Sequence, residues 1–268
     1  MSDNLHINAD RFSGFADVYE SVRPQMPRYA IETVKRYLGK NPDVVVDLGC
    51  GTGLSTLVWV GTSDRIIGVD PSLDMISIAR EKAKNIQSVE FMQGFADSTN
   101  LADACTDAVI CSQSFHWMEP QSTLREVNRI LKPNGIFLTL DCDWPPVCNL
   151  EAEVEYNKLF DLVEEKEATD PSIRSTFRKW AKEKHLSNIK NSGYFAYARE
   201  IVFANRELCT AGRFIGLARS QGSLQSVLKR APEVVSLPLK EFETAIKDIF
   251  GQYKLEIDFC YRMRIGIK

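Results

Sequence analysis

Short apolar runs recur along the first half of the chain, and segments of helical periodicity separate them. The runs lack polar alternation, which is typical of strands buried on both faces of a parallel sheet. They lie at 44–46, 65–69, 89–92, 108–111 and 136–140. The helical segments lie at 55–61, 73–84 and 122–131, after a helical region at 12–39 that Pro24 and Pro27 interrupt. Strands that alternate with helices predict a doubly wound α/β sheet.

The second half follows a different pattern. The residues Asp141-Cys-Asp-Trp-Pro145-Pro146 end the alternation of strands and helices. Charged helical stretches are then predicted within 150–191, a strand at 195–205, and helices at 206–230 and 238–250. The tail from Leu255 alternates apolar and polar positions, which predicts a long antiparallel edge strand.

Composition and charge argue against a nucleic-acid-binding or membrane protein. The chain has 268 residues, of which 44% are hydrophobic, and its formal net charge of −3 leaves no positive excess for binding a polyanion. Nucleic acid is therefore not an expected partner. The N-terminal residues show no signal peptide, and no apolar run approaches the roughly 20 residues of a membrane span. We expect a cytoplasmic protein that does not enter a membrane.

The seven cysteines are odd in number and scattered, and no Cys-x-x-Cys pair occurs among them. This pattern is typical of reduced thiols in a cytosolic protein. We therefore expect neither a disulfide framework nor a zinc site, and we assign no metal ligand.

A glycine-rich turn follows the first strand, in the sequence Asp47-Leu-Gly49-Cys-Gly51-Thr-Gly53. Glycines let a ligand approach the backbone, and a helix beginning near Leu54 would offer free N–H groups. Dinucleotide sites require a third glycine where this chain has Leu54, and Asp47 would repel a diphosphate. Asp47 would instead attract S-adenosylmethionine, which carries an ammonium and a sulfonium. A turn of this kind can also serve packing alone.

The motif Asp-x-Gly-x-Gly-x-Gly at a strand end resembles the first motif of class I S-adenosylmethionine-dependent methyltransferases. The resemblance implies a Rossmann-like, seven-stranded, mostly parallel sheet with an antiparallel C-terminal edge strand. It implies S-adenosylmethionine as cofactor and S-adenosylhomocysteine as product. The loop residues that it assigns to the cofactor are Asp47, Gly49, Gly51 and Gly53. It is good over 9–140 and poor over 145–191 and 206–250, so we expect one methyltransferase domain, 1–268, whose helical insertions cap the active site.

Two further segments support the resemblance. The second strand ends at Asp70-Pro71, where an acid can accept hydrogen bonds from both ribose hydroxyls of an adenosine, although Asp70 can equally cap the next helix. Met75 matches a methionine that commonly lies against the adenine in this family, although methionine is also typical of a core. The segment Gly94-Phe95-Ala96-Asp97 resembles the adenine-edge turn of the family. Phe95 stands where many members carry Asp, so Asp97 or the backbone alone would bind the adenine.

The fourth strand runs into Cys111-Ser-Gln113-Ser-Phe115-His116-Trp117 at the expected crevice, where we assign Gln113 to the cofactor and Trp117 to the substrate. The His116-Trp117 pair and the opening Phe12-x-x-Phe15-x-x-x-Tyr19-x-x-x-Arg23-Pro24 resemble the methyltransferase type 11, trans-aconitate methyltransferase-like branch. One helix face can present Tyr19 and Arg23 to a carboxylate of cofactor or substrate, or pack on the sheet. His116 is either a catalytic base or a structural hydrogen-bonding group.

The expected function is methyl transfer from S-adenosylmethionine to a small molecule, for which the resemblance points to a carboxylic acid. A carboxylate is already nucleophilic at neutral pH, whereas a hydroxyl, amine or carbon acid would need a general base. Two alternatives remain open. One is a non-catalytic S-adenosylmethionine-binding regulatory protein, and the other, which the glycine spacing disfavours, is a nicotinamide-dependent oxidoreductase. We expect a monomer or a homodimer.

Overall fold

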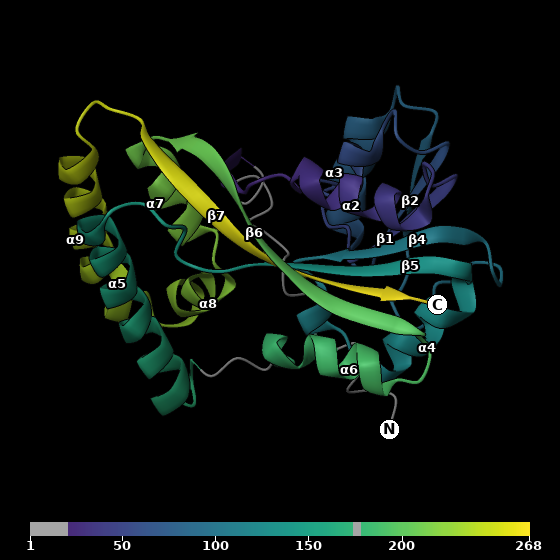
Figure 1. Ribbon diagram of the computed structural model, residues 1–268. Helices are drawn as coiled ribbons and strands as arrows, with labels where there is room; N and C mark the ends of the chain where they lie inside the picture. Colours follow the sequence, from purple (N-terminus) through teal and green to yellow (C-terminus); the bar gives the residue numbers. More distant parts are fainter. Residues whose placement is uncertain (1–20, 174–177) are drawn as a thin grey trace.

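The computed structural model describes residues 21–173 and 178–268, which form one seven-stranded sheet of order β3-β2-β1-β4-β5-β7-β6 (Figure 1). The strands are β1 (Val44–Leu48), β2 (Arg65–Asp70), β3 (Val89–Gln93), β4 (Thr106–Ser112), β5 (Leu131–Cys142), β6 (Tyr197–Cys209) and β7 (Leu255–Ile267). Strands β1 to β5 pair in parallel, whereas β7 is antiparallel to both β5 and β6. The predicted mostly parallel sheet with an antiparallel C-terminal strand is confirmed. β7 lies second from the edge, because β6 pairs along its outer side.

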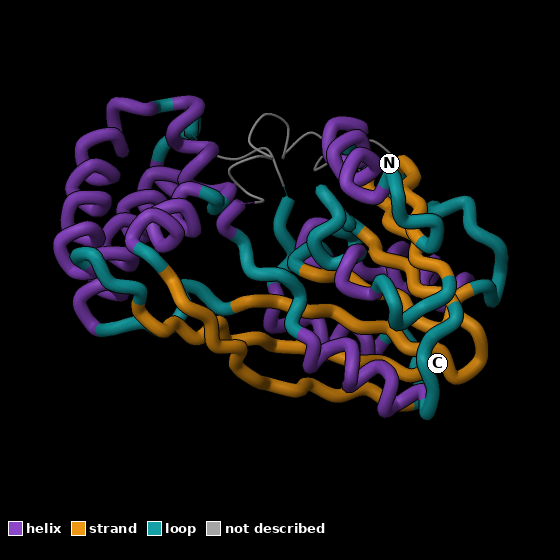
Figure 2. Tube along the Cα trace, turned by 90° about the horizontal axis from the view of Figure 1, so that it is seen from above, coloured by secondary structure: helices purple, strands orange, loops and turns teal. Residues whose placement is uncertain are grey.

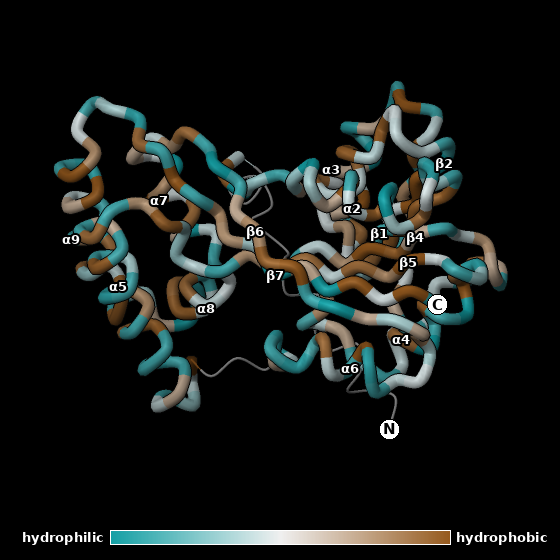
Figure 3. Tube along the Cα trace, viewed as in Figure 1, coloured by the Kyte–Doolittle hydropathy of each residue, from teal (hydrophilic) through white to brown (hydrophobic). Residues whose placement is uncertain are grey.

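The central strands are buried on both faces, as their apolar runs predict. Alternate side chains of a strand point to opposite faces of a sheet. Val45 of β1 therefore packs with α2 (Arg28–Leu38), whereas Val46 packs with α4 (Pro120–Ile130) on the opposite face. α3 (Leu73–Ala83) contacts β2 and β3, and α6 (His185–Asn191) contacts β6 and β7. Figure 3 shows hydrophobic residues along these central strands, between the two helical layers.

Local capping fixes where two of these helices begin. Ser72 accepts a hydrogen bond from the Met75 N–H at the start of α3, which satisfies one N–H that lacks a partner in the helix. Glu119 accepts from two backbone N–H groups at the start of α4, and Pro120 occupies its first turn. The predicted helices at 73–84 and 122–131 are confirmed to within two residues. Asp70, which precedes α3, and Glu119, which precedes α4, both line one pocket.

Four helices form a separate lobe at one end of the long strands β6 and β7 (Figures 1 and 2). They are α5 (Leu150–Thr169), α7 (Ala211–Arg219), α8 (Gly222–Arg230) and α9 (Pro232–Phe250). Aromatic side chains fill the lobe, where Tyr156 lies with its ring edge-on to Phe214 and Phe242. Of the ranges 145–191 and 206–250 that were expected to be helical insertions, helices occupy 150–169, 185–191, 211–219, 222–230 and 232–250, whereas 206–209 still belongs to β6. The expected cap over the active site stays a prediction.

Two segments in the first half of the chain also differ from the sequence-based expectation. The segment 55–61 was expected to be a helix, but it contains turns and one 3-10 turn, η1 (Leu57–Trp59). Ser55 and Thr56 donate their hydroxyl hydrogens to Asp47, and Gly61 has a φ of +78° that ends the segment. The strand expected from 136 begins at Leu131, because Thr106 already pairs with Leu131 across an irregularity in the register.

No helix in the described ranges is long and apolar enough to cross a bilayer.

Candidate cofactor and acceptor pocket

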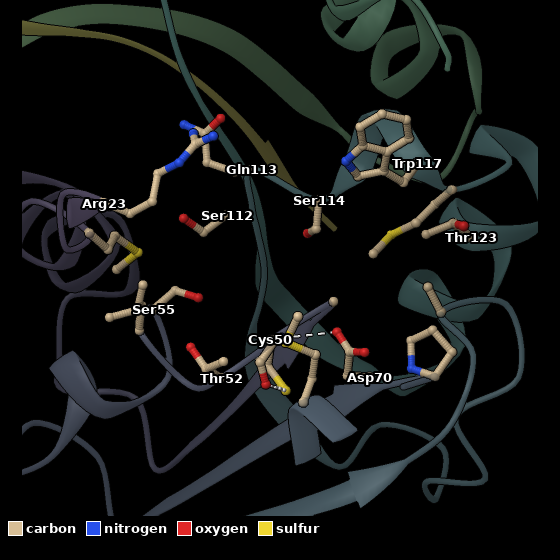
Figure 4. Close-up of a pocket in the computed structure, with 18 of the residues that line it drawn as sticks. Arg23, Cys50, Thr52, Ser55, Asp70, Ser112, Gln113, Ser114, Trp117 and Thr123 are labelled. Carbon is tan, nitrogen blue, oxygen red and sulfur yellow. Dashed lines mark hydrogen bonds between the residues drawn. The ribbon is translucent and has the colours of Figure 1, made fainter. Parts of the chain in front are cut away.

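A pocket opens where β1, β2 and β4 end, at the carboxyl edge of the sheet (Figure 4). This is the edge at which open α/β sheets bind ligands. Of the residues that the sequence assigns to cofactor or substrate, most line it. They are Arg23, Gly49, Gly51, Asp70, Pro71, Met75, Phe95, Ala96, Asp97, Gln113 and Trp117. The structure therefore brings segments from 23 to 117 into one site, while Tyr19, Phe12 and Phe15 lie outside the described residues.

The three glycines of the turn have different surroundings. All have positive φ, at +68° for Gly49, +54° for Gly51 and +87° for Gly53. A Cβ at Gly49 would lie 2.6 Å from the Ser114 Cβ, and a Cβ at Gly53 would lie 2.8 Å from the Phe91 ring. A Cβ at Gly51 would meet no described atom within 4 Å, and Gly51 lines the pocket. Gly49 and Gly53 thus permit tight packing, while Gly51 leaves space for a ligand.

The backbone of this turn is already hydrogen-bonded within the protein. Gly49 and Cys50 both donate their N–H groups to the Val69 carbonyl, at 2.8 and 3.2 Å. Gly51 donates to the Asp70 carboxylate, and Gly53 donates to the Cys50 carbonyl. The helix that the sequence predicts near Leu54 is not formed. These four N–H groups are therefore already occupied and do not converge on a phosphate.

Asp47 lies beneath the pocket and does not line it. Its side chain is fully buried, and its Oδ2 accepts hydrogen bonds from Ser55 Oγ at 2.6 Å and Thr56 Oγ1 at 2.7 Å. Its Oδ1 has no hydrogen-bond partner among the described residues. Burial raises the pKa of Asp47 to about 6, against the two hydroxyl hydrogen bonds, which lower it. A negative charge below the turn favours a positively charged group above it.

Asp70 ends β2 with its carboxylate directed into the pocket (Figure 4). Its Oδ2 accepts from the Gly51 N–H and its Oδ1 from the Ser72 N–H, each at 2.9 Å. Burial raises its pKa, while these two hydrogen bonds lower it. Each carboxylate oxygen can accept a second hydrogen bond, so a ligand diol can still bind. The two backbone donors hold the carboxylate in one orientation for that purpose.

Two segments form the pocket wall next to Asp70: the apolar Met75 side chain and the backbone turn at 95–97. Met75 is buried and reaches the pocket from the first turn of α3. The Phe95–Asp97 segment forms a turn in which Ser98 donates its N–H to the Phe95 carbonyl. Flat apolar surface beside polar backbone suits a heteroaromatic ring.

The opposite end of the pocket carries Arg23, which is the only basic residue that lines it in the described part of the chain. Its Nε donates to Ser220 Oγ at 2.8 Å and its Nη2 to the Ser220 carbonyl at 2.9 Å. Its guanidinium lies 4.6 Å from the centre of the Trp144 ring. Gln113 lies near Arg23 in Figure 4 and has a φ of +55°. The helical lobe thus holds the pocket's one lining cation in place through Ser220.

His116 does not line the pocket. Its side chain is buried, and its Nδ1 lies 3.4 Å from Asp141 Oδ1 without hydrogen-bond geometry. Burial lowers the pKa of His116 to about 3, although Asp141 opposes the shift. His185, fully buried, lies on the other side of the same carboxylate at 3.7 Å, and burial lowers its pKa to about 4. His116 is thus absent from the residues that line the described pocket, and its low pKa makes it a weak proton acceptor, while its assignment as a catalytic base stays a prediction.

Two aromatic residues of the pocket were not assigned from the sequence. Trp144 follows β5 and Tyr261 lies on β7, and both line the end that holds Arg23. Tyr261 is buried, and its hydroxyl has no hydrogen-bond partner among the described residues. The Asp-Trp-Pro-Pro interruption was the available signal for Trp144. Tyr261 arrives from the far end of the chain through sheet pairing, which the alternation of the tail does not indicate.

The central segment is similar to known methyltransferases. Residues 46–139 match a family model described as a methyltransferase domain. The chain is 33% identical over 119 residues to an uncharacterised methyltransferase-like protein of Schizosaccharomyces pombe, covering 44% of this chain and 45% of that protein. The aligned part of this chain thus spans about half the length of each of these relatives.

Solved structures extend the likeness to the whole fold. A protein of Anaeromyxobacter dehalogenans described as a type II methyltransferase superimposes with a TM-score of 0.69 at 19% identity, over 91% of this chain and 97% of that chain. A phosphoethanolamine N-methyltransferase of Haemonchus contortus, solved with phosphomonomethylethanolamine and S-adenosylhomocysteine, gives 0.56 at 15% identity. The alignment covers 100% of this chain and 61% of that one. The protein has the Rossmann-like fold of these methyltransferases.

Proposed function

We propose that the protein is an S-adenosylmethionine-dependent methyltransferase whose acceptor is a small carboxylic acid. The observation that carries the proposal is the arrangement around Gly51 and Asp70 within the methyltransferase domain, 46–139. The open space above Gly51 and the fixed Asp70 carboxylate fit an adenosine with a cationic methionine tail. That the Haemonchus contortus enzyme binds S-adenosylhomocysteine in a similar fold supports the choice of cofactor.

The adenosine half would lie along the Asp70 side of the pocket. Asp70 would accept hydrogen bonds from the two ribose hydroxyls, using the lone pairs that Gly51 and Ser72 leave available. Met75 and Pro71 would pack on the adenine face, and the turn at 95–97 would contact its edge.

The charges favour a cationic ligand over a nicotinamide dinucleotide. The ionisable residues that line the described pocket include Asp70, Asp97 and Glu119 but only one cation, Arg23. Asp47 adds a buried carboxylate below the turn, and the N–H groups of Gly49, Gly51 and Gly53 are already used. A diphosphate would therefore meet mainly negative charge, whereas an ammonium and a sulfonium would be attracted.

S-adenosylmethionine supplies an activated methyl group for in-line displacement, in which positioning accounts for much of the catalysis. The chain's contribution is to hold the acceptor at the Arg23 end and to exclude water. Trp144, Tyr261 and Trp117 give that end apolar walls, and Arg23 would pair with the acceptor's carboxylate. No histidine lines the described pocket, which agrees with an acceptor that needs no general base.

The helical lobe would close this end of the pocket. Its link to the site is Ser220, which lies between α7 and α8 and holds Arg23. A carboxylic acid is also the acceptor class that the trans-aconitate methyltransferase-like motifs imply. The lobe would then belong to the acceptor site, in one domain with the sheet.

The test has two stages. A thermal unfolding scan compares S-adenosylhomocysteine with NAD, since a ligand at 100 times its Kd stabilises the folded state by about 2.7 kcal/mol. Stabilisation by S-adenosylhomocysteine alone is expected, and stabilisation by NAD alone would refute the proposal. A screen of small carboxylic acids with methyl-labelled cofactor should then yield a labelled ester. Binding without transfer to any acceptor class would instead identify a regulatory protein, and transfer only to amines or hydroxyls would refute the carboxylic acid.

A further inference from the structure

Three buried side chains outside the pocket meet around one point. His116 comes from η2 (Phe115–Trp117), Asp141 from the end of β5, and His185 from the start of α6. One nitrogen of each imidazole and one carboxylate oxygen all lie within 4.8 Å of one another. His185 is fully buried, and the side chains of His116 and Asp141 are only 7% and 3% exposed.

Three of the four imidazole nitrogens of this cluster have no hydrogen-bond partner among the described residues. His116 Nδ1, His185 Nδ1 and His185 Nε2 are buried and have no hydrogen-bond partner among the described residues. Buried polar atoms are hydrogen-bonded in nearly all structures, so a group of orphan nitrogens around one carboxylate requires an explanation such as an ion. A neutral imidazole offers a nitrogen lone pair to a metal ion, and each ring has a buried nitrogen without a described partner.

We propose that His116, Asp141 and His185 bind a divalent transition-metal ion, and zinc is the ion that the donor set fits best. Two imidazoles and one carboxylate are a common set of zinc ligands, at about 2.0–2.2 Å from the metal. Ligand atoms of a tetrahedral site are then roughly 3.3 Å apart. Asp141 Oδ1 lies 3.4 Å from His116 Nδ1, and Asp141 Oδ2 lies 3.7 Å from His185 Nε2. The three ligand atoms, which lie within 4.8 Å of one another, would have to draw together toward that spacing around a bound ion.

The charged side chains around Asp141 determine whether a metal cation can bind there. Arg264 donates to Asp141 Oδ2 at 2.7 Å and to Glu200 at 2.7 Å, so these two acids and one base leave a net negative charge. Lys182 lies 3.3 Å from Asp141 Oδ1 and supplies the balancing positive charge. Its side chain is 34% exposed, so it can turn into solvent when a metal takes its place. The competing interpretation is that Lys182 is the permanent counter-ion.

A metal bound by this cluster would link the segment at 179–185 to the turn that carries Trp117, which lines the pocket. Trp180 donates its N–H to the His116 carbonyl at 2.9 Å, and the Lys179 ammonium lies 5.3 Å from the centre of the Trp117 ring. Trp117 lines the pocket next to His116. A metal held by His116 and His185 would therefore fix the segment at 179–185 against the turn that carries Trp117. The inference does not depend on methyl transfer.

The test is calorimetric titration of zinc into chelator-treated full-length protein, followed by cobalt substitution read by visible absorption. One site per chain is expected. His116→Gln and His185→Gln should each weaken zinc by more than the roughly 10–100-fold that loss of an outer-shell partner costs. Lys182→Met should tighten binding, because it removes a competing cation from Asp141. Asp143→Asn is the matched control, since Asp143 lies two residues away on the surface and pairs with Arg262.

Each contrary outcome overturns the proposal. Absence of zinc binding to the wild type would mean that Lys182 and Arg264 are the permanent partners of Asp141. Zinc binding that survives both histidine substitutions would place the ion on cysteines, as would thiolate charge-transfer bands in the cobalt spectrum. If a histidine variant does not fold, Lys182→Met and the cobalt spectrum still decide, because unchanged affinity after Lys182→Met contradicts a metal at Asp141.

Discussion

Asp47 carries its carboxylate where water cannot reach it, and this has a measurable consequence at the scale of single residues. Because its folded-state pKa of about 6 lies above its ordinary value, the folded protein binds this proton more tightly than the unfolded chain does. Its contribution to the free energy of unfolding is therefore most favourable below about pH 4 and is lost as the pH rises through about 6.

We expect Asp47→Asn to remove this dependence. One amide oxygen can still accept from Ser55 and Thr56, while the buried charge disappears. The free energy of unfolding of the variant minus that of the wild type should grow by about 2 kcal/mol between about pH 4.5 and about pH 7.5. Urea unfolding at the two pH values measures this difference. A constant difference would show that Asp47 is not charged in the folded state at neutral pH.

His116→Gln should reduce turnover only modestly once an acceptor is known. The imidazole faces Asp141 instead of the pocket, so the loss should stay below the roughly 10²-fold at the low end of acid–base contributions. Steady-state kinetics at saturating cofactor give the value, and circular dichroism verifies the fold. A far larger fall in kcat, with S-adenosylhomocysteine affinity intact, would show that His116 acts as a general base.

At the scale of elements, the glycine-rich turn combines two functions that substitutions can separate. Gly51→Val places a side chain where no described atom lies within 4 Å, in the space assigned to the ligand. Gly61→Val is a matched control, since Gly61 also has positive φ, at +78°, and open space, but does not line the pocket. Both variants should lose about 1–2 kcal/mol of stability through backbone strain.

Only Gly51→Val should lose S-adenosylhomocysteine binding in calorimetry. Equal loss of binding in both variants would mean that strain, and not the position of the side chain, abolishes the site. Normal binding to folded Gly51→Val would contradict the proposed path of the ligand over the turn.

The elements also show what the sequence can and cannot predict. Central strands such as β1 and β4 were predictable because burial on both faces requires continuous apolar residues. The segment at 55–61 was not, since its helical periodicity says nothing of the bonds that Ser55 and Thr56 make to Asp47. Asp70 and Gly51 were found because their motif is local. Tyr261 was missed because pairing of β7 with β5 brings it to the pocket from far along the chain.

At the scale of the whole molecule, the helical lobe is tied to the pocket by the hydrogen bonds between Ser220 and Arg23. Ser220→Ala removes the hydroxyl that accepts from Arg23 Nε and leaves the Ser220 carbonyl in place. A hydrogen bond to a charged group contributes about 1.5–3 kcal/mol, so the acceptor's KM should rise by roughly 10-fold or more. Affinity for S-adenosylhomocysteine should be unchanged. If the cofactor affinity falls instead, Arg23 binds the methionine carboxylate and the acceptor site lies elsewhere.

The central claim is that the pocket at the carboxyl edge of the sheet binds S-adenosylmethionine through Asp70, and calorimetric titration of S-adenosylhomocysteine tests it most directly. Asp70→Ala should weaken binding by about 1.5–3 kcal/mol, because charge-assisted hydrogen bonds to the ribose are lost. Asp74→Ala is the control, since Asp74 is an exposed carboxylate at the start of α3 that does not line the pocket. The account predicts loss of affinity in Asp70→Ala alone. Equal affinity of wild type and folded Asp70→Ala would contradict it.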